Sequence, residues 1–106
     1  MEEFELCRIK NENVDLHEYA ELKEDGSFSI HGEDFGTTAS EVFDTDDYEY
    51  WYSFTAEEAG CLVRSFDGMD LKTILKENFS GIEGDRKLTK YCDEHHIHYT
   101  FHSEIS

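Results

Sequence analysis

The sequence contains no proline and no long apolar run. Without proline, none of its turns depends on the fixed φ angle of that residue. No stretch approaches the roughly 20 consecutive apolar residues that cross a membrane as a helix. The N-terminal segment MEEFELCRIK lacks the basic stretch followed by an apolar core that is typical of a secretory signal peptide. We therefore expect a soluble, cytoplasmic protein.

Basic residues are also scarce. The 106-residue chain has 9 lysines and arginines against 26 aspartates and glutamates, which gives a formal net charge of −17. Nucleic acids and anionic membranes attract proteins through positive charge. We therefore expect neither of them to bind this chain directly, and we expect its partner to be a basic protein.

Recognisable motifs of catalysis and metal binding are missing as well. Cys7, Cys61 and Cys92 are far apart and form no C-x-x-C unit, so neither a disulfide framework nor a zinc knuckle is indicated. The sequence offers no glycine-rich phosphate loop and no nucleophile paired with a base. We expect a protein that is not an enzyme and has no cofactor and no bound metal. A further alternative is a metal-binding or enzymatic domain that uses His96 and His98, which the alternation places on one strand.

Aromatic residues, by contrast, are plentiful. They make up 14% of the chain and hydrophobic residues 38%, whereas chains that stay disordered because of their charge lack such residues. The length suits one modest core, so we expect residues 1–106 to form a single acidic domain.

Alternation of apolar and polar residues predicts the strands. It indicates strands at about 3–9, 14–22, from 28 onward, 47–54 and 97–102. Asp25-Gly26 is a strong turn signal and predicts that the second and third strands form an antiparallel hairpin. In the fourth strand, Tyr48, Tyr50 and Tyr52 share one face, and Trp51 lies on the other.

Capping residues and spacing predict the helices. Thr55 and Glu58 form a capping box ahead of an amphipathic run, Asp70 caps a second helix, and a third is expected at about 85–95. The segment 37–43 suits a short helix or a turn. The order is β-β-β-short α-β-α-α-α-β. It predicts an α+β domain with a mainly antiparallel sheet of four to five strands and about three helices packed on one face.

The negative charge is unevenly distributed along the chain. Residues 1–60 carry a net charge of −15 and residues 61–106 a net charge of −2. The segment from Glu24 to Val63 contains no lysine or arginine, yet aromatic residues run through it, so we expect it to be folded. The carboxylates of this segment, with Trp51 as an aromatic anchor, form the predicted partner-binding surface: Glu24, Asp25, Glu33, Asp34, Asp44, Asp46, Asp47, Glu49, Trp51, Glu57 and Glu58.

A rigid acidic surface reproduces the negative field that a nucleic-acid-binding groove attracts. The leading hypothesis is therefore a small inhibitor that blocks a nuclease, a CRISPR effector or another nucleic-acid-handling protein. Immunity proteins against nuclease toxins and nucleic-acid mimics of the anti-CRISPR or anti-restriction kind belong to this class. The alternative is an acidic adaptor that binds through the aromatic strand or a sheet edge, without nucleic-acid mimicry.

Overall fold

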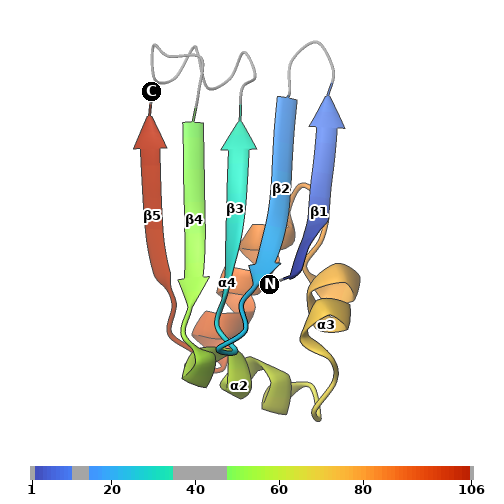
Figure 1. Cartoon of the computed structure of the whole chain (residues 1–106), viewed down its shortest axis with the longest axis vertical. Helices are drawn as coiled ribbons and strands as arrows, with labels where there is room; N and C mark the ends of the chain where they lie inside the picture. The colour runs from blue at the N-terminus through green and yellow to red at the C-terminus, as the bar shows by residue number, and fades with distance from the viewer. Residues whose placement is uncertain (1, 11–14, 35–47, 106) are drawn as a thin grey trace.

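The computed structural model describes residues 2–10, 15–34 and 48–105. Over these residues it confirms the α+β fold, with a five-stranded antiparallel sheet and three helices on one of its faces (Figure 1). Each strand pairs with its neighbour in sequence order, and all three helices lie between the fourth and fifth strands. The expected short helix at 37–43 lies outside the described residues. The elements are β1 Glu2–Lys10, β2 Asp15–Leu22, β3 Phe28–Asp34, β4 Tyr48–Phe54, α2 Ala56–Ser65, α3 Leu71–Asn78, α4 Gly84–Glu94 and β5 Thr100–Ile105.

The expected turn joins β2 to β3. The amide of Gly26 donates to the carbonyl of Lys23 at 3.1 Å, and Gly26 has a φ of +92°, which glycine adopts without steric cost. The carboxylate of Asp25 accepts hydrogen bonds from the hydroxyl and the amide of Ser27, and these bonds lower the pKa of Asp25. The turn therefore fixes the register in which Leu22 faces Phe28.

The predicted caps begin α2 and α3. The amide of Glu58 donates to the side chain of Thr55 at 3.1 Å, and the carboxylate of Glu58 accepts from the amide of Thr55 at 2.9 Å. This reciprocal pair satisfies two amides that the first turn of a helix leaves without partners. The side chain of Asp70 accepts from the amide of Thr73 at 3.2 Å. None of the described helices is long and apolar enough to cross a membrane.

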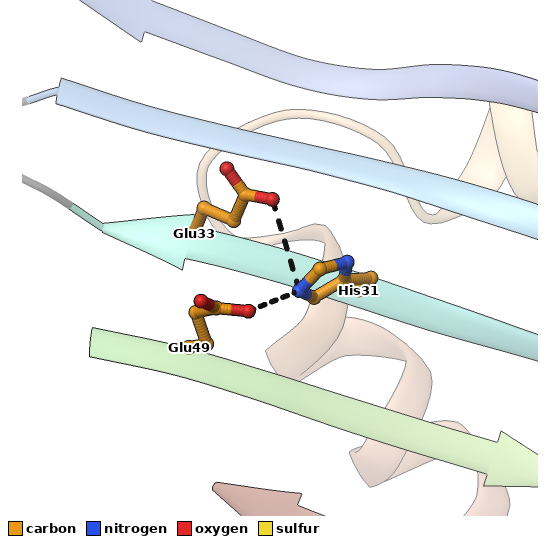
Figure 2. Close-up of side chains that lie close together, drawn as sticks. All are labelled: His31, Glu33 and Glu49. Atoms are coloured by element: carbon orange, nitrogen blue, oxygen red, sulfur yellow. Dashed lines mark hydrogen bonds and ion pairs between the residues drawn. The ribbon is translucent and has the colours of Figure 1, made fainter. Parts of the chain in front are cut away.

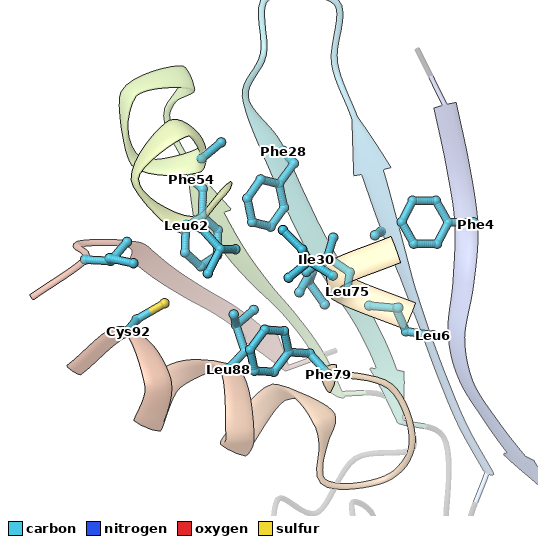
Figure 3. Packing of buried hydrophobic residues seen from close by; sticks show 14 residues of the cluster. Phe4, Leu6, Phe28, Ile30, Phe54, Leu62, Leu75, Phe79, Leu88 and Cys92 are labelled. Atoms are coloured by element: carbon cyan, nitrogen blue, oxygen red, sulfur yellow. The ribbon is translucent and has the colours of Figure 1, made fainter. Parts of the chain in front are cut away.

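The core lies between the helices and one face of the sheet (Figure 3). The rings of Phe28 and Phe54 stack at 4.4 Å between centroids, where the two strands are in register. Helices α2, α3 and α4 contribute Leu62, Ile74 and Leu88, all fully buried. Burying side chains of this size contributes about 1.5–3 kcal/mol each.

One sequence expectation fails at the C-terminal end. His96 and His98 were expected on the last strand, but β5 begins only at Thr100. The amide of Ile97 donates to the carbonyl of Cys92 at 2.8 Å, and His96 has a φ of +57°. The chain therefore closes the end of α4 with a left-handed residue before it enters the sheet.

Candidate functional site

In the described part of the chain, the face of the sheet turned away from the helices stays open (Figure 1). Its side chains come from the polar positions of the alternating strands, because successive residues of a strand point to opposite faces. Strands β2, β3, β4 and β5 contain no lysine or arginine. The basic residues Arg8 and Lys10 lie on β1, and most of the others lie on the helices.

A row of four rings crosses this open face. Tyr19, His31, Trp51 and His102 stand directly opposite one another on β2, β3, β4 and β5. His31 stacks on Trp51 at 4.7 Å with an angle of 12° between the planes, and His102 lies on the other side of Trp51 at 5.3 Å. We call these four residues the ring row. Since imidazoles flank Trp51 on both sides, its indole is held in one orientation.

A second row lies beside the first, toward the start of β4. Glu33, Glu49 and Glu104 are directly opposite one another on β3, β4 and β5, and we call them the carboxylate row. Like charges placed opposite each other on neighbouring strands destabilise a sheet. Nearby imidazoles offset part of this cost, since Nε2 of His102 lies 3.2 Å from an oxygen of Glu104.

His31 joins the two rows (Figure 2). Its Nδ1 is hydrogen-bonded to the hydroxyl of Tyr19. Its Nε2 lies 3.0 Å from Oε2 of Glu49 and 3.9 Å from Oε1 of Glu33. The residue is only 8% exposed, so its ring is fixed by packing although it belongs to the open face. Both nitrogens of the imidazole are therefore engaged, one by a phenol and one by two carboxylates.

The structure brings together part of the surface predicted from sequence. Glu33, Glu49 and Trp51 meet on the open face. Asp34 lies at a strand position of the opposite face, the one that the helices cover, because it pairs with Leu16 and Tyr48.

Other predicted residues gather at the far end of the sheet. Glu24 and Asp25 belong to the β2–β3 turn, and Glu57 and Glu58 to the first turn of α2. The predicted positions Asp44, Asp46 and Asp47 lie outside the described residues.

The sequence expectations missed three members of the site, Tyr19, His31 and His102. The signal for Tyr19 and His31 was present, because the Asp25-Gly26 turn sets the register that makes them neighbours. The contact between His31 and Glu49 could not be predicted, because residues 35–47 separate β3 from β4 in the sequence and no local pattern determines how these strands pair. His96 and His98, the histidines singled out from sequence, belong to no group of three or more converging metal ligands among the described residues.

A buried acidic group lies on the other face of the sheet. Glu18 is 2% exposed and accepts a hydrogen bond from the Tyr50 hydroxyl at 2.6 Å through Oε2. Its Oε1 is buried without a hydrogen-bond partner among the described residues. Burial, with a smaller contribution from the charge of Asp85, raises the pKa of Glu18 to about 7, against the lowering effect of the Tyr50 hydroxyl.

Gly32 makes the bond between Tyr50 and Glu18 possible. Gly32 lies between the two residues in the sheet, on β3. A Cβ atom added at Gly32 would fall 1.9 Å from the Cζ atom of Tyr50. The absence of a side chain therefore lets the phenol ring cross β3 and reach β2.

No protein-family model matches the chain, and neither does any curated protein or solved structure with which it was compared. The case for a function therefore rests on the residues of the open face.

Proposed function

We propose that this chain is a small acidic binding protein that inhibits a basic, nucleic-acid-handling protein. In this proposal, the open face of the sheet covers the groove in which that partner holds nucleic acid. A nuclease-toxin immunity protein and a nucleic-acid mimic of the anti-CRISPR or anti-restriction kind both fit this description. The observation that carries the proposal is that β2–β5 hold the carboxylate row and the ring row side by side without one lysine or arginine.

The carboxylate row supplies the charge. Its members lie on adjacent strands, which are spaced by about 4.8 Å, so a basic groove meets a line of negative groups on a rigid support. Such a field accelerates the encounter with a cationic partner and makes association sensitive to salt. Carboxylates also accept two parallel hydrogen bonds from an arginine side chain.

The ring row supplies apolar contact area. Trp51 is half-buried and flanked by His31 and His102, so little side-chain entropy is lost when a partner covers it. Aromatic residues with this kind of fixed geometry are enriched among residues that dominate binding energy. Because His31 and His102 lie against the indole, we expect the partner's cations to bind to the carboxylate row and its apolar groups to cover the rings.

The test is capture of the partner from a native cell lysate, with two matched charge reversals. The first variant combines Glu33→Lys with Glu49→Lys on the open face, and the second combines Glu24→Lys with Glu57→Lys at the other end of the sheet. Both change the net charge equally. Capture at low salt, after nuclease treatment, should be lost in the first variant and kept in the second, and high salt should release the partner.

The captured protein is then assayed for inhibition. The proposal requires that it be a basic nucleic-acid-binding protein and that the wild-type chain prevent it from binding or cleaving nucleic acid. Equal loss of capture in both charge-reversed variants would reduce the interaction to overall charge and refute a specific surface. Capture that neither variant affects would exclude the open face.

A second candidate function is the acidic adaptor. It is favoured by Phe101 on β5, which is 48% exposed on a strand that has no neighbour on its outer side in the described sheet. An exposed strand edge can pair with a strand of another protein. The adaptor is the better description if the captured partner keeps its nucleic-acid binding while in complex and if Phe101→Ser abolishes capture.

A further inference from the structure

Three metal-binding side chains converge on the open face, at the junction of the two rows (Figure 2). Nε2 of His31 and one oxygen each of Glu33 and Glu49 all lie within 4.8 Å of one another. His31 and Glu33 lie two residues apart on β3, on the same face, and Glu49 is directly opposite Glu33 on β4. The register of the sheet therefore creates the group, and no loop is needed to complete it.

The separations between these atoms fit a small divalent ion. Zinc binds imidazole nitrogen and carboxylate oxygen at about 2.0–2.2 Å, so two ligand atoms in a tetrahedral site lie about 3.4 Å apart. The observed distances from Nε2 of His31 are 3.0 Å to Glu49 and 3.9 Å to Glu33, on either side of that value.

The ligand orientation is already fixed by neighbouring groups. A metal-binding histidine typically holds its second nitrogen in a hydrogen bond, which sets the tautomer and the ring plane. The Tyr19 hydroxyl plays this part at Nδ1 of His31, and Trp51 stacks on the ring. With a metal on Nε2, Nδ1 carries the proton and donates it to the oxygen of Tyr19.

The ligand atoms, one imidazole nitrogen and two carboxylate oxygens, indicate which metal ion the site prefers. Calcium and magnesium prefer oxygen ligands throughout, whereas imidazole together with carboxylates suits zinc. Two carboxylates and a neutral imidazole carry a charge of −2, which a divalent cation cancels. The side chains of Glu33 and Glu49 are 28% and 35% exposed, so an ion reaches them from solvent and keeps a fourth position open.

We propose that His31, Glu33 and Glu49 form a Zn²⁺-binding site on the open face, with a solvent-accessible fourth coordination position. The ion removes the repulsion between Glu33 and Glu49 and stiffens the pairing of β3 with β4. This inference concerns the chain alone. Its test needs no partner protein, so it stands or fails separately from the inhibitor proposal.

The experiment is a titration of the metal-free full chain with Zn²⁺, followed by calorimetry. One equivalent should bind in the wild type. His31→Gln, Glu33→Gln and Glu49→Gln each remove one ligand at nearly unchanged size, and each should weaken binding at least tenfold. Far-UV circular dichroism of each variant shows that the fold is kept, and Zn²⁺ should raise the melting temperature of the wild type but not that of these three variants.

Two controls separate this site from other acidic and histidine side chains. Glu104→Gln removes the third member of the carboxylate row, which is no ligand, and should bind Zn²⁺ as the wild type does. The double variant His96→Gln with His98→Gln removes exposed imidazoles elsewhere and should also keep the single equivalent.

The only tryptophan of the chain gives a direct readout, because Trp51 stacks on the proposed ligand. Co²⁺, used as a paramagnetic probe, should quench the fluorescence of Trp51 at one equivalent, and Zn²⁺ should restore it by competition. Absence of stoichiometric Zn²⁺ binding overturns the proposal. Binding that survives His31→Gln but is lost in the His96/His98 double variant overturns it as well.

Discussion

Replacing Glu18 by glutamine should remove most of the pH dependence that this residue gives to stability. Its pKa is about 7 in the folded protein, against 4.5 for an exposed glutamate. Below pH 4.5 the carboxyl group is protonated in both the folded and unfolded chains, so it contributes no pH dependence. Between pH 4.5 and 7 the unfolded chain releases the proton and the folded chain keeps it, so stability falls as pH rises. Above pH 7 the carboxyl group is ionised in both states, and the folded protein is destabilised by the full free energy of ionising buried Glu18.

The magnitude follows from the difference between the two pKa values. Each pH unit corresponds to about 1.4 kcal/mol, so the total cost above pH 7 is about 3 kcal/mol. Between pH 5 and pH 8 the wild type should lose about 2 to 3 kcal/mol through Glu18 alone. That is a large share of the roughly 5–15 kcal/mol by which small domains are stable.

Burial is the main reason why the negative form of Glu18 is disfavoured, and the groups that face it add to this effect or offset it. The Tyr50 hydroxyl donates to one carboxylate oxygen, while the other oxygen is buried without a partner among the described residues. Asp85 of α4 raises the pKa further through its charge, and the Cys7 thiol on β1 has its own pKa raised by burial and by Glu18. None of the groups that shift the pKa of Glu18 is positively charged.

The assay is urea unfolding of the wild type and of Glu18→Gln at pH 5 and pH 8. The glutamine oxygen can still accept from Tyr50, and its amide nitrogen takes the place of the unpartnered oxygen at a cost that does not vary with pH. The variant should therefore gain about 2 to 3 kcal/mol relative to the wild type on going from pH 5 to pH 8, a change of roughly 1 to 2 M in urea midpoint. Glu21→Gln, on the same strand but on the open face, controls for the loss of one negative charge.

Two results would refute this reasoning. If Glu18→Gln keeps the pH slope of the wild type, the carboxyl group is ionised in the folded protein at pH 5. If Glu21→Gln flattens the slope as much as Glu18→Gln does, the effect comes from general repulsion in a chain of net charge −17 and not from burial.

Substitutions at three further positions test the packing of the sheet and the formation of α2. Gly32→Ala should destabilise the fold by about 1–3 kcal/mol in urea unfolding, because its Cβ collides with the ring of Tyr50; wild-type stability would show that the ring moves aside freely. Gly60→Ala in α2 should stabilise by up to about 1 kcal/mol, since only the flexible end of Arg64 lies near the new methyl group, and a lower melting temperature would contradict this. Thr55→Ala should cost about 1 kcal/mol through loss of the cap, whereas Thr55→Ser should unfold at nearly the wild-type urea concentration.

Local patterns in the sequence predicted most of the fold. Alternation located β1 to β4, the Asp25-Gly26 turn located the hairpin of β2 and β3, and the residues Thr55 and Asp70 located the starts of α2 and α3. These signals work because each depends on residues close in the sequence. The start of β5 was misplaced because the alternation begins at Ile97, whose inward position is set by the end of α4 and not by a strand.

The candidate site was predictable only in part, because it depends on the sheet register. Trp51 was expected on the face away from the core, and its register with His31 and His102 places it there. The meeting of His31 with Glu49 depends on how β3 pairs with β4, which no local pattern determines. Glu18 lies between Leu16 and Ala20 in the alternating pattern of β2, so its side chain points toward the core. Charged residues are rarely buried, and the sequence therefore did not indicate its hydrogen bond with Tyr50.

The three helices that the structure describes all lie between β4 and β5, and this has a consequence for synthesis. Residues 48–54 leave the ribosome well before residues 100–105, with which they pair. At about 5–20 residues per second, the outer edge of β4 stays without its partner for some seconds. That edge belongs to the most aromatic of the described strands, which is the kind of segment that aggregates when it is exposed. We therefore expect the negative charge of the N-terminal half to keep nascent chains apart until β5 is made.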